Sequence, residues 1–216
     1  MKVLYGIDIV GLTPLLTNAI SPKVVEALVN DQTVAQPRPR TDEEVQAVCE
    51  AALYRNAEGQ IGLPARLFWA ALCEAGTLVQ YDGKRKISTQ NGTLLPQLLT
   101  IGPEFLVFQT EPIWRPFWNI VYRKTGRRKE RIKIWRPRFD CWAVRVDVEI
   151  VERQIDMERV KTLFYLAGRR CGVGAFRVGM GGAVKETLQE NPNPKKPIGH
   201  FGKWEPRGWN LRIATA

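Results

Sequence analysis

Alternation of apolar and other residues predicts four β-strands in this chain. The strands are expected over residues 3–9, 98–108, 142–150 and 209–213, because a period of two places every second side chain on the same face. In the third strand Arg145, Asp147 and Glu149 form the second face, which is therefore expected to lie open to solvent or ligand. The second strand is expected to be interrupted by a turn or bulge at Gly102-Pro103.

Apolar residues at helical spacing predict two core helices. The first is expected to begin with Pro64 at its first position, where the missing N–H has no consequence, and to end at Gly76. The second is expected to be capped by Asp156 and to end at Gly168. Two shorter helices are expected before them, one beginning at Pro22 and one beginning after the capping-box pair Thr41 and Glu44.

The order of these elements predicts an α+β fold of the ferredoxin-like or RRM-like class. Strand, helix, strand, strand, helix, strand is the split β-α-β arrangement, with a four-stranded antiparallel sheet and both helices on one face. A chain of 216 residues is expected to form a single domain over 1–216. Three insertions interrupt the pattern, a helical one at 17–60, a basic hairpin at 111–138 and a loop at 183–198.

The segment from Ile113 to Arg138 suggests a binding function because it concentrates the positive charge. It holds ten Lys and Arg residues and one acidic residue, nearly all of the chain's net charge of +10. Aromatic residues are interleaved with the cations, and Thr125-Gly126 is expected to lie at the hairpin tip. Clustered cations bind phosphate backbones, and aromatic rings offer bases a stacking surface. The alternative is a solvated basic hairpin with its aromatics packed beneath it.

The candidate nucleic-acid contacts fall in this segment and in a glycine-rich segment near the C-terminus. On the insert they are Arg123, Lys124, Arg127, Arg128, Lys129, Arg131, Lys133, Arg136 and Arg138, with Trp118, Tyr122 and Trp135 as stacking residues. In the glycine-rich segment they are Arg169, Arg170, Gly172, Gly174, Arg177 and Lys203. Glycine lets backbone amides approach phosphate, but a tightly packed glycine corner explains the same pattern.

The sequence offers few residues that could form a catalytic, metal or cofactor site. The four cysteines are widely spaced and the chain has one histidine, so neither a zinc site nor a disulfide framework is expected, and no cofactor is expected. His200, with Tyr165 or a lysine, is a weak candidate for an acid–base pair of a metal-independent endoribonuclease. The sequence has no apolar run of membrane-spanning length and no signal-peptide pattern, which predicts a cytoplasmic protein.

Four short motifs resemble those of the RAMP superfamily, RRM-fold proteins that include the guide-RNA-binding backbone subunits of CRISPR effector complexes. They are GLTPLL at 11–16, IGLPARLFWAAL at 61–72, GVGAF at 172–176 and GHFGKWE at 199–205. The resemblance implies single-stranded nucleic acid, RNA first, as the ligand of the sheet face and of a thumb-like hairpin. It also implies copies that associate along the strand with other ribonucleoprotein subunits. Related phage-encoded proteins share such features.

Three functions remain open on this evidence. The first is a non-enzymatic single-stranded nucleic-acid-binding protein of a CRISPR-type or phage ribonucleoprotein, with a phage single-stranded DNA-binding protein as a variant of it. The second is a metal-independent endoribonuclease of the same superfamily. The third is a structural protein whose basic hairpin docks on an acidic partner.

Overall fold

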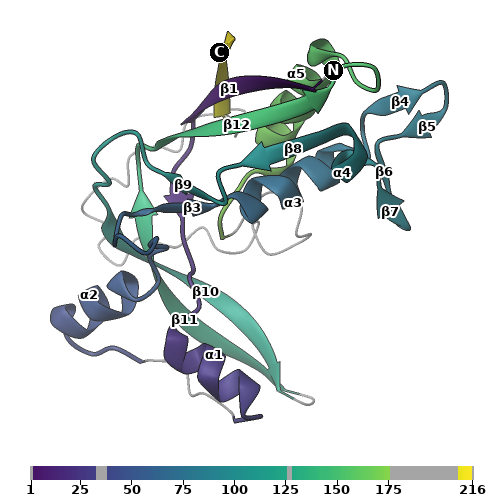
Figure 1. Ribbon diagram of the computed structural model, residues 1–216. Coiled ribbons are helices and arrows are strands. Elements are labelled where there is room, and N and C mark those ends of the chain that lie inside the picture. Colours follow the sequence, from purple (N-terminus) through teal and green to yellow (C-terminus); the bar gives the residue numbers. More distant parts are fainter. Residues whose placement is uncertain (1, 33–37, 126–127, 176–208, 216) are drawn as a thin grey trace, which may run out of the picture.

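The computed structural model describes residues 2–32, 38–125, 128–175 and 209–215, and shows an α+β chain with several antiparallel sheets. The largest sheet has four strands in the order β13, β1, β12, β8, and each neighbouring pair is antiparallel (Figure 1). The strands are β1 (Lys2–Gly11), β8 (Leu99–Gly102), β12 (Ala143–Val151) and β13 (Trp209–Thr215). The sequence alternation at both ends of the chain therefore builds one sheet.

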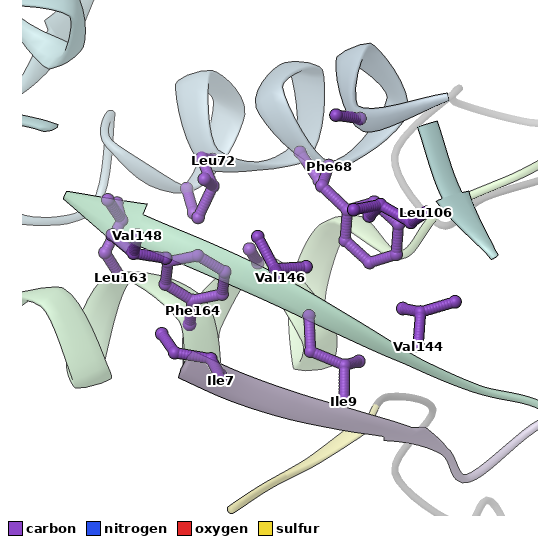
Figure 2. Close-up of a cluster of buried hydrophobic side chains, with 14 of the residues drawn as sticks. Ile7, Ile9, Phe68, Leu72, Leu106, Val144, Val146, Val148, Leu163 and Phe164 are labelled. Atoms are coloured by element: carbon purple, nitrogen blue, oxygen red, sulfur yellow. The ribbon is translucent and has the colours of Figure 1, made fainter. Parts of the chain in front are cut away.

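The core lies between one face of this sheet and two helices, α3 (Ala65–Ala75) and α5 (Met157–Leu166). Ile7 pairs with Val146 and Ile9 with Val144, so these four side chains point to the same face, where all are fully buried. Figure 2 shows this face against side chains of both helices. The helices contribute Phe68, Leu72, Leu163 and Phe164, which are also fully buried.

Both core helices differ from expectation at one end. Pro64 is the N-cap of α3 rather than its first helical residue, because its ψ of 131° is extended. Helix α5 begins after Asp156, whose carboxylate accepts from Arg159 N as expected, but Gly168 does not end it. A π-helical turn, Ala167–Cys171, follows without a break, and Gly172 ends it with a φ of 67° that favours glycine.

The strand expected over 98–108 is two strands in two different sheets. Residues 95–98 form α4 (Leu95–Leu98), β8 follows it in the main sheet, and β9 (Phe105–Val107) pairs instead with β3 (Gly62–Pro64). The break lies at Gly102-Pro103, as expected, because proline lacks the N–H that a continued ladder needs. The alternation alone could not show that the strand changes partner there.

The helical insertion contains α1 (Pro22–Val29) and α2 (Asp42–Glu50). The capping box is present, since Glu44 N donates to Thr41 Oγ1 and Thr41 N donates to the Glu44 carboxylate. Residues 80–93 form two small hairpins. Their strands are β4 (Gln80–Asp82), β5 (Arg85–Lys86), β6 (Ser88–Thr89) and β7 (Gly92–Thr93).

Among the described residues no helix is long and apolar enough to cross a membrane.

The pairing of β3 with β9 predicts that Gly62 tolerates no side chain. A Cβ at Gly62 would collide with the backbone carbonyl of Leu106 and the ring of Phe105, whereas a Cβ at Gly102 would have no neighbour within 4 Å. Gly62→Ala is therefore expected to lower the free energy of unfolding by about 1–3 kcal/mol. Gly102→Ala, the matched control in another strand, should change it by less than about 0.5 kcal/mol. Urea unfolding measures both, and equal midpoints would contradict this packing.

Candidate nucleic-acid interface

The basic insert is a two-stranded hairpin, as predicted. Strands β10 (Arg115–Thr125) and β11 (Arg128–Phe139) pair residue for residue, from Arg115 opposite Arg138 to Thr125 opposite Arg128. The predicted tip, Gly126, and the candidate Arg127 lie outside the described residues. Because opposite residues in an antiparallel pair share a face and successive residues alternate, this pairing divides the insert into an inner and an outer face.

The inner face packs against the helical insertion. Phe117, Asn119 and Arg136 belong to this face, and helix α2 contacts both strands of the hairpin. Only 8% of Asn119 and 9% of Arg136 is exposed. Figure 1 shows the hairpin extending away from the four-stranded sheet, with α2 near its base. The inner face is thus packed in the folded interior between the hairpin and the helical insertion.

Arg136 is a correction to the predicted nucleic-acid contacts. Its Nε donates to Asn18 Oδ1 at 3.3 Å, and Tyr54 Oη donates to Asn18 O at 3.1 Å. Burial lowers the pKa of Arg136 and raises the pKa of Tyr54, the latter opposed by the charges of Arg66 and Arg136. A guanidinium so buried cannot reach a phosphate on the surface, so Arg136 holds the hairpin to the helical insertion.

Arg138 also has a structural role, at the base of the hairpin. Its Nε donates to Asp140 at 2.7 Å, and Arg115 pairs with the same carboxylate at 3.0 Å. Burial acts to raise the pKa of Asp140, but the hydrogen bonds and charges of Arg138 and Arg115 outweigh it and lower that pKa. The Arg138 guanidinium also lies over the ring of Phe117, 5.2 Å from its centroid. Much of its charge is therefore compensated within the protein.

The outer face interleaves aromatic rings and cations, as the sequence predicted for the insert as a whole. Successive pairs on this face are Trp118 with Trp135, Ile120 with Lys133, and Tyr122 with Arg131. Lys133 and Arg131 are exposed, Tyr122 is 48% exposed, and both tryptophans are partly exposed. The next pair along the ladder is Lys124 with Lys129.

Cations lie directly over these rings. Lys133 Nζ is 4.3 Å from the ring centroids of both Trp118 and Trp135, and Arg131 Cζ is 5.7 Å from the centroid of Tyr122. These distances are within the range of cation–π attraction. The outer face, defined here as Trp118, Tyr122, Arg131, Lys133 and Trp135, can present π surfaces and positive charge to one ligand.

Other candidates of the insert are placed by their backbone alone. Arg123 is opposite Glu130, and Arg128 is opposite Thr125. By register, both pairs belong to the inner series of the ladder, the one that includes Phe117 with Arg136. The alternation of Arg131, Lys133 and Trp135 with Ile132 and Ile134 was the sequence signal that could have separated the two faces.

The glycine-rich segment approaches the base of the hairpin. Arg169 and Arg170 lie in the π-helical turn, and Arg169 Nε donates to Tyr165 Oη at 3.2 Å. Three residues after this turn ends, Gly174 reaches strand β2 (Leu15–Leu16), and Ala175 N donates to Leu16 O at 2.8 Å. Strand β2 also pairs with β11 at Arg138, so the structure brings the glycine-rich segment and the hairpin base to one place.

Gly172 and Gly174 have structural explanations. Gly172 has φ +67°, Gly174 has φ +85°, and a Cβ at Gly174 would lie 2.5 Å from the carbonyl oxygen of Leu16. A turn and a close backbone approach account for both glycines, as the packed-corner alternative expects. The other candidates of this region, Arg177, His200 and Lys203, and the loop 183–198, lie outside the described residues.

The open face of the four-stranded sheet is a poorer candidate than the hairpin. Arg145 lies between Asp8 and Asp147, at 3.7 and 3.8 Å, and Lys2 pairs with Glu149 at 2.9 Å. The described side chains of β1, β8 and β12 place no aromatic ring on this face. On these three strands the open face therefore has compensated charges and no stacking surface.

Within the described part of the chain, no group of three or more His, Cys, Asp or Glu residues could hold a metal ion. Comparison with models of known protein families and with curated proteins gives no match.

The division into faces predicts that substitution of two cations of β11 changes the free energy of unfolding by different amounts. Arg136→Gln removes a buried, hydrogen-bonded charge and should lower the free energy of unfolding by about 1.5–3 kcal/mol. Lys133→Gln, three residues earlier on the exposed face, removes only exposed cation–π contacts and should lower it by at most about 1 kcal/mol. Urea unfolding followed by circular dichroism measures both. Equal effects would show that the two faces are not distinguished by burial.

The cysteines provide a pH-dependent test of the same packing. Burial raises the pKa of Cys49 to about 11, whereas Cys141 is exposed near the hairpin base. Only the thiolate is alkylated, so at pH 8 iodoacetamide should modify Cys141 in the folded protein and leave Cys49 unmodified. Because the pKa of Cys49 is raised, its modification should begin only at higher pH or on unfolding. Peptide mass spectrometry with Cys141→Ser as control checks this, and equal rates at pH 8 would refute it.

Proposed function

We propose that this protein is a non-enzymatic single-stranded nucleic-acid-binding protein that holds its ligand on the outer face of the hairpin. The observation that carries the proposal is the placement of Trp118, Trp135 and Lys133 together on one exposed face. Cations supply sequence-independent attraction to phosphates, and aromatic rings supply stacking for bases. Cation–π attraction within the hairpin accounts for the cations lying over the rings, but a nucleic acid is the ligand that uses both the rings and the charge.

A single strand is the ligand that uses both features. In a duplex the bases stack on each other and only their edges are accessible, whereas an unpaired base can be turned out onto an aromatic side chain. The proposal takes RNA as the first ligand and single-stranded DNA as the alternative. The backbone would be contacted by Lys124, Lys129, Arg131 and Lys133, with Arg123, Arg127 and Arg128 nearer the tip of the hairpin. The path would extend toward the glycine-rich segment at Arg169, Arg170, Arg177 and Lys203.

The wider proposal is membership of the RAMP superfamily in a CRISPR-type or phage ribonucleoprotein of the cytoplasm. The strand order β13, β1, β12, β8, with α3 and α5 over one face, supports a ferredoxin-like or RRM-like sheet. The hairpin between β8 and β12 has the position of a thumb in that superfamily. On this proposal several copies associate along one strand with other subunits, and no cofactor is required.

Binding is tested by two variants that remove equal charge. Lys129→Gln, Arg131→Gln and Lys133→Gln together remove three cations from the outer series of the hairpin. Lys84→Gln, Arg85→Gln and Lys86→Gln together remove three exposed cations around the β4–β5 turn. The hairpin variant should weaken binding of a fluorescent single strand at least tenfold at physiological salt, equivalent to about 1.4 kcal/mol. Its log–log salt slope should fall by about 2, three times the value of about 0.7 for each phosphate.

The β4–β5 variant should bind like the original protein, and a duplex of the same sequence should bind more weakly than the single strand. Fluorescence anisotropy at several salt concentrations gives the dissociation constants and the slopes. Equal losses in both variants would mean that net charge alone, and not the hairpin, attracts the nucleic acid. Unchanged binding in the hairpin variant would refute the proposed interface.

A further inference from the structure

We propose that Lys133 occupies a base-stacking position in the free protein and leaves it when a base enters. The inference rests on the proposed function and assigns one residue of the outer face the role of a displaceable cap. The position is the space shared by the rings of Trp118 and Trp135, which the Lys133 ammonium fills.

The geometry of the two rings identifies this space. Their centroids are 6.3 Å apart and their planes are tilted by 58°, so the rings are not stacked face to face on each other. Lys133 Nζ lies 4.3 Å from both centroids. An ammonium equally close to two tilted rings shows that a face of each borders the same space. A planar base that stacks on either face there must displace the ammonium.

The chemistry of lysine makes this displacement feasible. Its ammonium is a strongly hydrated point charge on a flexible stem of four carbons, so it can swing away without moving the backbone. Lys133 is exposed, with Ile120 as its cross-strand partner, and no carboxylate forms an ion pair with it among the described residues. A bound strand supplies both replacements at once: the base covers the ring, and a phosphate attracts the released ammonium.

Arg131 over Tyr122 is a different arrangement on the same face. Arg131 lies near one ring rather than between two, and the distance is longer, at 5.7 Å. A guanidinium is planar and can itself stack on a base. The exchange of a cation for a base is therefore assigned to Lys133 alone.

If a base displaces Lys133 from the rings, base stacking and phosphate binding are coupled. Independent contacts to bases and to phosphates would not produce this coupling. With a strand of normal bases, Lys133 is released and neutralises one phosphate. With an abasic strand of equal length and charge, nothing displaces Lys133 from the rings. The salt slope of the original protein should then be steeper by about 0.7 for the normal strand than for the abasic one. Lys133→Met, which keeps the stem and removes the charge, should abolish that difference.

The stacking arm of the experiment uses Trp118→Leu and Trp135→Leu with the same two strands. At least one variant should weaken binding of oligothymidylate about tenfold or more, while binding of the abasic strand changes less than about twofold. Trp118→Phe or Trp135→Phe should restore most of the loss, which a merely structural role of the side chain would not require. Tyr81→Leu, which removes a partly buried ring on β4, is the matched control and should leave the preference for bases unchanged.

The outcomes separate this inference from the function on which it rests. Urea midpoints of all variants establish that they are folded. Equal slopes for normal and abasic strands in the original protein, or equal losses on both strands in the tryptophan variants, overturn the cap while leaving binding by the hairpin intact. If neither strand binds, or if the three-charge hairpin variant binds normally, the proposed function fails and the inference fails with it.

Discussion

The organisation of the hairpin depends on the unbroken pairing of β10 with β11. Along this ladder each residue has one partner, with no shift in register from Arg115 and Arg138 to Thr125 and Arg128. The consequence is a strict separation of neighbours in sequence. Trp135 and Arg136 are adjacent in the chain, yet one contributes to an exposed cation–π cluster and the other to a buried hydrogen-bonded cluster. Charge density along the sequence therefore overstates the number of cations that a ligand can contact.

The hairpin and the helical insertion form one packed lobe. Arg136, Asn18 and Tyr54 come from three segments that are separate in the sequence, and hydrogen bonds through Asn18 join them. The four-stranded sheet has a different function in this arrangement. It carries the hydrophobic core on one face and self-compensated charges on the other, and β2 links the hairpin to it through the loop that follows β1. Under the proposed function, the sheet is a support and the lobe presents the ligand surface.

Much of the fold could be predicted because its signals are local. The alternation around Ile7 and Val146, the capping box of Thr41 and the N-cap Asp156 each involve residues within a few positions of one another. The misassignments involve partners that lie far apart in the sequence. The strand over 98–108 was divided because β9 pairs with β3, and α5 extended past Gly168 because that glycine is buried rather than placed at a helix end. For the candidate site, composition identified the segment, but only the register and the position of α2 distinguish Lys133 from Arg136.

The alternation of faces also limits how such a hairpin can change in length during evolution. Insertion of one residue into β11 would move every following side chain to the opposite face, so that Trp135 would turn inward and Arg136 would turn toward solvent. Insertion of one residue pair near the tip, one residue in each strand, would lengthen the hairpin by a rung without altering the buried cluster. Homologues are accordingly expected to differ in hairpin length by whole rungs, so that the reach of this surface can vary while its attachment to the protein is preserved.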